Sequence, residues 1–388
     1  MVRAMRRVKI SEVFDLQMGK TPSRNKPEYW NNGEYDWVSI RDLGGFGKYV
    51  GKTAETISGL GVTESGIKAV PARTLIMSFK LSLGKTAITT QPTYTNEAIM
   101  AFIDKGTYPI NLDYFYHQFS GRDWSAGTNK AVMGATLNKK TLADMVVAVP
   151  DAEEQAKVAA VLDGVELEID LQQRRLAAYD QLVKSRFVEM FGDLRGNKHC
   201  FPIETMEKVA IGIYDGEHGK VERAKDGPLF LSARNIGGGV LDYETAAHVT
   251  QAEYERISKR FNPMLGDVVL TCAGTIGRAA IVGDVPFVSD RDVALIKPDR
   301  DKVLSEYLLA FFKSDDALEQ MGQLTHAATI AHLYLGKIKS MRLLIPPIVK
   351  QREFASFVQQ VDKSRFAVQQ AIEQLETLKA SLMQEYFG

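Results

Sequence analysis

The chain has 388 residues, of which 45% are hydrophobic and 25% charged, and its formal net charge at pH 7 is zero. This length predicts two or three domains, and the composition is ample for hydrophobic cores and ordinary for a soluble protein. No run approaches the roughly 20 apolar residues of a membrane helix, and the two cysteines lack the paired spacing of a zinc site. The basic first residues are followed by polar ones, so we expect no signal peptide and a cytoplasmic protein.

Charge is distributed unevenly along the chain. Residues 1–150 carry 19 Lys and Arg against 13 Asp and Glu, whereas residues 201–346 carry 17 against 20. The first segment is basic enough to face phosphate. The second would have to gather its cations on one face to do the same.

Residues 10–149 have the short apolar runs of a mixed α/β segment. The runs at 70–79 and 98–103 predict strands, and residues 111–119 predict a helix. Residues 201–345 show the same mixture, with strands predicted at 267–271 and 293–296 and a helix at 304–312.

Two long helices are predicted, one over residues 152–190 and one at the end of the chain. In each, apolar residues recur every seven positions, which favours a coiled coil over the alternative of a long surface helix in a large domain. Gln172 is a polar interruption on the first seam that could set its register. The packing positions are Leu162, Ile169, Leu176, Val183 and Met190 in the first helix and Phe354, Val361, Val368, Leu375 and Leu382 in the second.

The second half of the chain repeats the first. Pro150 and Gln155 open the first long helix and Phe191-Gly192 closes it, and the same residues return 196 positions later at Pro346, Gln351 and Phe387-Gly388. Fainter matches lie on a shift of 193, and they pair residues 37–45 with 230–238, 84–88 with 277–281, and 135–137 with 328–330. Solenoid units run about 20–50 residues, so this longer repeat is two copies of a domain. We expect a globular domain over 1–149, a spacer helix over 150–192, a second globular domain over 193–345 and a C-terminal helix over 346–388.

Motifs for catalysis are absent from the sequence. The segment around Gly84 and Lys85 lacks the first glycine of a P-loop, since Phe79 stands there, and the six histidines show no metal-ligand spacing. We therefore expect no catalytic residue and no metal site in this chain.

The chain resembles the specificity (S) subunit of type I restriction–modification enzymes over nearly its full length. The features that carry the resemblance are Pro-x4-Gln at the start of each long helix, Phe-Gly at its end, the segment from Gly19 to Ser23, and the paired Ser-x-Arg-[Asp/Asn]-[Leu/Ile]-Gly-Gly segments beginning at Ser39 and Ser232. Their order, spacing and duplication are specific together. The second half departs from the pattern, because residues 215–220 lack the Gly-x-Thr-Pro sequence.

The resemblance implies an α+β fold with two target recognition domains, joined by two helices that form an antiparallel coiled coil with pseudo-twofold symmetry. Each domain would read half of a bipartite, asymmetric site in double-stranded DNA, and the helices would set the gap. Two methyltransferase (M) subunits would dock on this chain, and motor-nuclease (R) subunits would complete the complex. S-adenosylmethionine would belong to M, and ATP and Mg²⁺ to R, so that this chain holds no cofactor.

Candidate DNA contacts follow from this interpretation, with cations for phosphates or guanine and small polar side chains for backbone or base edges. In the first domain they are Lys20, Thr21, Ser23, Arg24, Asn25, Ser39, Arg41, Lys80, Ser82, Lys85, Thr128, Asn129 and Lys130. In the second they are Lys220, Arg223, Arg234, Asn235, Thr275, Arg278, Arg291, Thr325 and His326. The alternative for each is a solvated loop residue, and for Arg41 and Arg234 it is pairing with internal carboxylates.

Two other functions remain open at this point. The repeat could make a scaffold that bridges proteins and touches no DNA. The chain could also be an enzyme whose site the sequence does not reveal.

Overall fold

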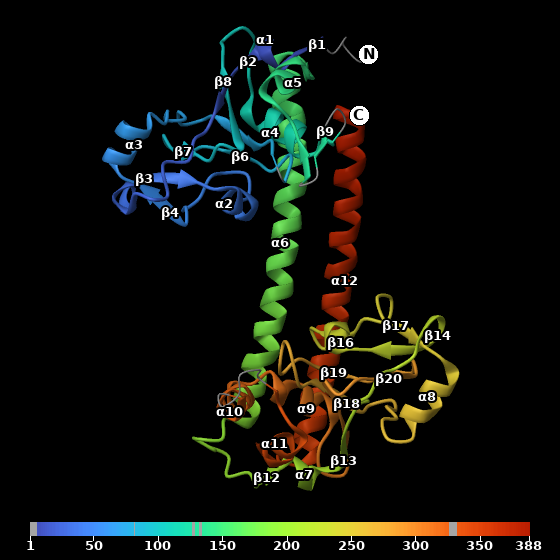
Figure 1. Ribbon diagram of the computed structural model, residues 1–388. Coiled ribbons are helices and arrows are strands. Elements are labelled where there is room, and N and C mark those ends of the chain that lie inside the picture. The colour runs from blue at the N-terminus through green and yellow to red at the C-terminus, as the bar shows by residue number, and fades with distance from the viewer. Residues whose placement is uncertain (1–5, 81, 126–128, 132–133, 326–331) are drawn as a thin grey trace. The chain divides into compact units, whose positions relative to one another are not determined.

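Figure 1 shows the computed structural model, which describes residues 6–80, 82–125, 129–131, 134–325 and 332–388. The chain divides into two compact units, one made of Met1–Leu171 with Ala371–Gly388 and the other of Gln172–Gln370. Each long helix therefore contributes one part to each unit. Helices and strands are mixed in both units, which confirms the expected α+β class.

The described strands of the first unit are β1 (Arg6–Lys9), β2 (Phe14–Met18), β3 (Trp30–Val38), β4 (Glu55–Ile57), β5 (Leu75–Ser78), β6 (Thr86–Ile88), β7 (Tyr94–Thr95), β8 (Ile99–Asp104), β9 (Asn129–Ala131), β10 (Gly134–Thr136) and β11 (Val146–Val149). They form an antiparallel sheet in the order β2-β8-β5-β6 and a second sheet in the order β4-β3-β7, where β3 and β7 run parallel. Two antiparallel pairs complete the unit, β1 with β11 and β9 with β10. The strand predicted at 70–79 begins only at Leu75, because Pro71 and the left-handed Arg73 (φ 55°) interrupt it.

The first unit contains several short helices and part of each long helix. They are α1 (Ile10–Val13), η1 (Pro27–Tyr29), α2 (Ile40–Gly45), α3 (Gly59–Ser65), α4 (Leu112–Ser120) and α5 (Lys139–Asp144), together with parts of α6 (Ala152–Phe191) and α12 (Ile348–Phe387). Helix α4 begins at Asn111, whose Oδ1 accepts two backbone N–H bonds of the first turn. Its Phe115 and Phe119 pack edge to face on Phe14 of β2, with ring centroids 5.1 and 6.3 Å away.

The described strands of the second unit are β12 (Ile203–Thr205), β13 (Ala210–Asp215), β14 (Arg223–Leu231), β15 (Ile236–Gly237), β16 (Val240–Leu241), β17 (Ala247–Val249), β18 (Val268–Thr271), β19 (Ala279–Ile281), β20 (Phe287–Ser289), β21 (Val293–Pro298) and β22 (Arg342–Leu344). Its helices are α7 (Met206–Val209), η2 (Ala233–Asn235), α8 (Gln251–Ser258), α9 (Ser305–Phe312), α10 (Asp315–Thr325) and α11 (Leu335–Ser340), with the remaining parts of α6 and α12.

The two units repeat one topology. The sheet β13-β21-β18-β19 matches β2-β8-β5-β6, the sheet β17-β14-β20 matches β4-β3-β7, and the pair β12-β22 matches β1-β11. Even the irregularity recurs, because β3 and β14 each carry a bulge of several residues opposite the neighbouring strand. The duplication predicted from three short sequence matches is confirmed. One of those matches, 328–330, lies outside the described residues.

Within each unit the two long helices run antiparallel. In the first unit, Glu166 of α6 pairs with Lys379 of α12 at 2.7 Å, and Tyr386 and Phe387 near the end of α12 pack on the core beside the start of α6. In the second unit, Asp180 pairs with Arg365 at 2.6 Å, and further along α6 Arg186 contacts Glu353 at 3.2 Å, nearer the start of α12. The antiparallel helix pair is therefore confirmed.

The predicted heptad positions face inward. Leu162, Phe354, Val361 and Val368 are buried, and Ile169, Leu176, Val183, Leu375 and Leu382 are partly buried. Gln172 is 9% exposed and its Oε1 accepts a hydrogen bond from Arg175 at 3.1 Å. The predicted packing positions are thus apolar, and Gln172 is a buried polar residue beside them.

A buried glutamine ties the start of each long helix to its globular domain. The side chain of Gln155 accepts from the N–H of Asn111 at 2.8 Å and donates to the carbonyl of Pro109 at 2.8 Å, just before α4. Gln351 makes the same contacts before α9, accepting from Leu304 N–H at 2.9 Å and donating to a carbonyl at 2.9 Å. Both glutamines are 0% exposed, so these bonds satisfy polar groups that water does not reach. This explains why glutamine recurs in step in the two repeats.

Candidate nucleic-acid interface

Three loops that the sequence predicts to contact DNA meet around one turn of the first domain. The turn lies between β7 and β8, and the N–H of Asn96 in it donates to the carbonyl of Val38 at 3.0 Å. The N–H of Lys20 donates to the carbonyl of Thr95 at 2.8 Å. In the loop between β5 and β6, the N–H of Phe79 donates to the carbonyl of Ala98 in the same turn at 3.0 Å. These three loops, which carry the candidates at 20–25, 39–41 and 80–85, therefore share one region of the first domain.

Gly19 makes this convergence possible. A Cβ at this position would lie 2.2 Å from the carbonyl oxygen of Thr95, which no side chain tolerates. The chain can therefore approach the turn closely only with glycine here. Beyond it, Lys20 donates to the carbonyl of Ser65, and the hydroxyl of Thr21 bonds to Glu97.

Arg24 is held in place by a ring and a carboxylate. Its guanidinium lies 3.7 Å from the centroid of the Trp30 ring, and its two terminal nitrogens donate to the carboxylate of Glu55 at 2.5 and 3.0 Å. A stacked and bidentate arginine keeps little rotamer freedom. Arg24 is therefore a preorganised cation on the loop that follows Gly19.

Several candidate side chains maintain the local backbone. Ser39 caps α2 by accepting the N–H of Asp42 at 3.1 Å, and Ser232 forms the equivalent box with Asn235, whose Oδ1 accepts the N–H of Ser232 at 3.0 Å. Asn235 is 1% exposed, so its side chain does not reach solvent. At both positions the arginine two residues after the serine is exposed instead.

The second domain repeats the loop cluster around the turn between β20 and β21. The N–H of Glu217 donates to the carbonyl of Ser289 at 2.9 Å, and the N–H of Arg291 donates to the backbone carbonyl of Glu217 at 3.0 Å. Gly216 takes the place of Gly19, because a Cβ here would lie 2.3 Å from the Ser289 carbonyl oxygen. Residues 215–220, which lack the Gly-x-Thr-Pro sequence, are thus the structural counterpart of that segment.

Arg223 lies beside this second cluster. Its guanidinium is 3.7 Å from the centroid of the Phe230 ring, and Phe230 stands where the first domain has Trp37. Burial and the neighbouring Asp292 raise the pKa of Asp290 on the turn, while the charges of Arg223 and Arg291 oppose that shift. Each domain therefore places a stacked arginine next to its loop cluster.

The remaining candidates are mostly exposed. Lys20, Ser23, Asn25, Arg41, Ser82, Lys220, Arg234, Thr275, Arg278 and Arg291 are exposed, and Thr21, Lys80 and Lys85 are partly buried. Thr128 and His326 lie outside the described residues, as do the side chains of Asn129, Lys130 and Thr325.

A charged cluster where α4 contacts α6 in the first unit was not predicted from the sequence. The imidazole of His117 is 0% exposed and lies 2.7 Å from Asp163 of α6, which Lys48 also contacts at 2.7 Å. Burial alone would raise the pKa of Asp163, but hydrogen bonds from Lys48 and His117 outweigh it and lower that pKa. On the other side of His117, Glu166 lies 3.7 Å away. These residues are far apart in the chain, so no sequence spacing reveals the cluster.

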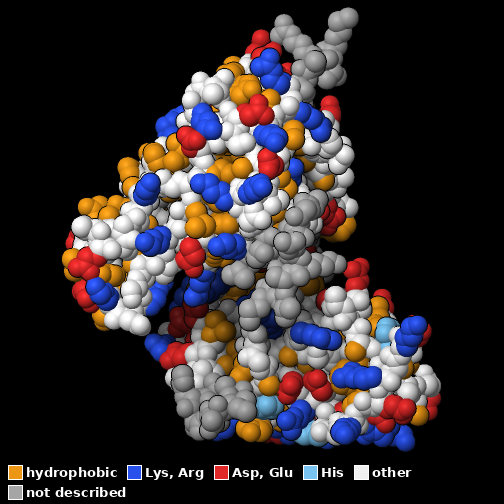
Figure 2. Space-filling view, turned by 45° about the horizontal axis from the view of Figure 1, so that its top comes forward, with side chains coloured by type: hydrophobic (Ala, Val, Ile, Leu, Met, Phe, Trp, Pro, Cys, Tyr) orange, Lys and Arg blue, Asp and Glu red, His pale blue; other side chains and the backbone are white. Residues whose placement is uncertain are grey.

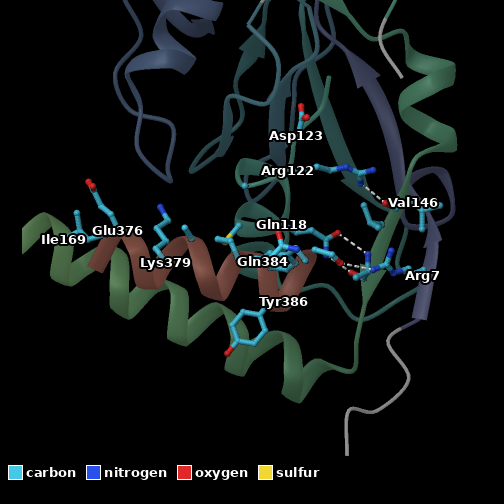
Figure 3. Close-up of a pocket in the computed structure, with 17 residues that line it drawn as sticks. Arg7, Gln118, Arg122, Asp123, Val146, Ile169, Glu376, Lys379, Gln384 and Tyr386 are labelled. Carbon is cyan, nitrogen blue, oxygen red and sulfur yellow. Dashed lines mark hydrogen bonds between the residues drawn. The ribbon is translucent and has the colours of Figure 1, made fainter. Parts of the chain in front are cut away.

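Each unit also contains a groove beside the long helices. In the first unit a cavity of about 790 Å³ lies between α12, the end of α4 and Ile169, with Glu376 and Lys379 on its wall (Figure 3). In the second unit a cavity of about 360 Å³ lies between α6, the end of α9 and Arg365, with Asp180 on its wall. Asp180 and Glu376 are 196 positions apart, as are Ile169 and Arg365, so the two grooves are equivalent.

The surface carries both signs of charge. On the face in view in Figure 2, Lys and Arg side chains are interspersed with Asp and Glu. This fits the zero net charge of the chain. Within the part of the chain that the structure describes, none of the helices has both the length and the apolar character needed to cross a membrane.

Comparison with known proteins identifies the family. The family described as "Type I restriction modification DNA specificity domain" matches residues 4–178 and 219–377, and these two matches fall on the two repeats. The chain belongs to this family. The resemblance inferred from the sequence motifs is thereby confirmed.

One relative and two solved structures match along nearly the whole chain, and a second relative matches along most of it. The MjaIX specificity subunit of Methanocaldococcus jannaschii is 21% identical, over 97% of this chain and 90% of its own length. The EcoBI specificity subunit of Escherichia coli is 22% identical, over 81% of this chain and 72% of its own. The fold is similar to the crystal structure of the type I restriction-modification S subunit from M. genitalium, which has a TM-score of 0.54, 12% identity and coverage of 100% and 98%. A chain from a structural study of type I R-M complex assembly has a TM-score of 0.62 and 15% identity, with the same coverage.

Proposed function

We propose that this chain is a non-catalytic DNA-specificity subunit whose two globular domains each read one half of an asymmetric, bipartite site. The observation that carries the proposal is the repeated loop cluster. Both domains make matching backbone contacts to one turn, from Lys20 and Phe79 in the first and from Glu217 and Cys272 in the second, yet the exposed side chains around it differ. A shared scaffold with divergent loops is what two readers of different sequences require.

Different side chains on the clusters would do different work. Exposed lysines and arginines would bind phosphates and supply salt-sensitive affinity. The two stacked arginines, Arg24 and Arg223, would contact base edges, since a preorganised guanidinium can donate two parallel bonds to guanine. Ser39 and Asn235 would contribute to DNA binding indirectly, by fixing the backbone at the start of α2 and of η2.

The long helices would act as the spacer. Each is 40 residues long, which corresponds to about 60 Å of helix at about 1.5 Å per residue. Their antiparallel pairing would set a constant gap between the half-sites, so that the gap is a property of geometry. Methyltransferase subunits with S-adenosylmethionine, and nuclease subunits with ATP and Mg²⁺, would supply the chemistry.

The two equivalent grooves would each dock one methyltransferase subunit. Leu182 and Leu378 are equivalent positions beside them and are 46% and 47% exposed. We expect Leu182→Glu to abolish binding at one groove and Leu378→Glu to abolish binding at the other, so that each single variant binds one methyltransferase subunit per chain. The double variant should bind none. Mass measurement of the purified complex gives the stoichiometry, and two bound subunits in the double variant would rule out these grooves.

Methylation mapping tests the proposed function as a whole. Co-expressed with its methyltransferase subunit, the chain should direct adenine methylation to one split, asymmetric motif with a constant gap. Methylation of a single continuous motif would contradict the proposal. So would methylation that needs the methyltransferase subunit but not this chain.

A further inference from the structure

The loop between β5 and β6 is organised by one buried hydroxyl. Ser78, at the end of β5, is 0% exposed. Its Oγ donates to the carbonyl of Ser82 and accepts the N–H of Lys85 at 3.1 Å. The backbone of Ser78 also binds the far side of the loop, since its carbonyl accepts the N–H of Gly84 at 3.0 Å. A single side chain thus satisfies one polar group in the middle of the loop and one just before β6.

The second domain has the same arrangement between β18 and β19. Thr271 is 0% exposed, and its Oγ1 donates to the carbonyl of Thr275 at 2.5 Å and accepts the N–H of Arg278 at 3.0 Å. Its carbonyl accepts the N–H of Gly277 at 3.1 Å. Gly84 and Gly277 both have left-handed backbones, with φ of 82° and 90°, which glycine adopts without strain.

Both halves therefore share a pattern of a hydroxyl residue, five residues, a glycine and a cation. Residues between the hydroxyl and the glycine differ in the two domains, for example Lys80 against Ala273. The hydroxyl bonds, the glycine and the cation persist. The loop also contacts the turn at the centre of each cluster. The N–H of Phe79 donates to the carbonyl of Ala98 at 3.0 Å, and the N–H of Cys272 donates to the carbonyl of Asp292 at 2.7 Å.

We propose that Ser78 and Thr271 are positioning residues for DNA reading, each of which holds one loop so that its cation, Lys85 or Arg278, faces the DNA. This inference rests on the proposed function and assigns the role to residues that do not reach DNA themselves. A hydroxyl at this position both donates to the carbonyl of Ser82 or Thr275 and accepts the N–H of Lys85 or Arg278. Serine and threonine both carry this group, whereas alanine and valine can make neither bond.

The test uses the full chain in complex with its methyltransferase subunit, with methylation measured on DNA carrying either the correct motif or one changed base in either half-site. Ser78→Ala should lower discrimination at the half-site of the first domain by about tenfold, the effect of losing roughly one buried hydrogen bond. Discrimination at the other half-site should stay unchanged. Thr271→Val, which keeps the shape of threonine, should lower discrimination at the half-site of the second domain and leave the other half-site unchanged.

The conservative exchanges separate positioning from simple destabilisation. Ser78→Thr and Thr271→Ser should keep wild-type discrimination at both half-sites, and thermal melting of all four variants reports their folding. Unchanged discrimination in both Ser78→Ala and Thr271→Val, or an equal loss at both half-sites, would overturn the inference. A wild-type chain that directs no split motif would instead overturn the proposed function.

Discussion

Position 20 of the first domain is a lysine, and its counterpart in the second domain, position 217, is a glutamate. Both follow a glycine that touches the central turn, and both reach toward the equivalent helix, since Lys20 bonds the carbonyl of Ser65 at the end of α3 and Glu217 pairs with Arg256 of α8 at 2.7 Å. The backbone is thus the same while the charge is reversed. Divergence is concentrated in exposed loop side chains, and the residues that shape the loops are kept.

The largest expected effect concerns residues that the two halves share. Gln155→Leu and Gln351→Leu would each leave buried N–H and carbonyl groups without a partner, which costs about 3–5 kcal/mol because each such group costs about 1–3 kcal/mol. Chemical denaturation should show a similar loss in the free energy of unfolding for both variants. Gln369→Leu at an exposed position of α12 is the matched control. A loss of stability in only one of the Gln155 and Gln351 variants would show that the two glutamines are not equivalent.

The stacked arginines should separate the two domains functionally. Arg223→Ala should cost about 1–3 kcal/mol of DNA binding and relax base preference only in the half-site of the second domain. Arg24→Ala should do so only in the other half-site. Competition binding with singly changed sites measures both, and Lys259→Ala serves as an exposed control. Equal effects of one variant on both half-sites would show that the domains do not read separately.

A smaller effect is expected from the charged cluster of Lys48, His117 and Asp163 in the first domain. Because hydrogen bonds from Lys48 and His117 keep the pKa of Asp163 below its ordinary value of 3.8, its carboxylate stabilises the fold above that pH and loses this contribution as the pH falls through the lowered pKa. Asp163 is partly exposed, so Asp163→Asn should cost only about 1 kcal/mol at pH 7. In thermal melts, the difference from wild type should shrink as the pH falls below 3.8.

The equivalent position in the second domain is Gln359, which supplies the control. Gln359→Asn should leave the pH dependence of stability unchanged. A wild-type advantage over Asp163→Asn that does not shrink as the pH falls below 3.8 would contradict the account of this cluster.

The smallest effect concerns the charge reversal itself. Lys20→Glu should make the salt dependence of DNA binding shallower by about one unit of the log–log slope, and Glu217→Lys should make it steeper by about the same amount, since each phosphate contact contributes roughly 0.9. Binding measured across a salt series decides this. Slopes that do not move in either variant would remove these positions from the DNA contact surface.

Much of the architecture was predictable from the sequence. Seven-residue spacing revealed both long helices, and aligned residues such as Gln155 and Gln351 revealed the duplication, because buried positions with unique partners tolerate few alternatives. The correspondence of Gly216 with Gly19 was not predictable, since it depends on how close two backbone segments approach. The burial of Asn235 and the assembly of Lys48, His117 and Asp163 were likewise hidden, because they arise only when distant segments meet.

The most direct measurement is the methylation motif of a chain in which the second globular domain is replaced by a copy of the first. If the domains are equivalent scaffolds that differ in their reading loops, this chain with its methyltransferase subunit should modify a motif made of two copies of the first half-site. The gap between them should stay the same, because the long helices are unchanged. A motif that still contains the original second half-site would contradict the account.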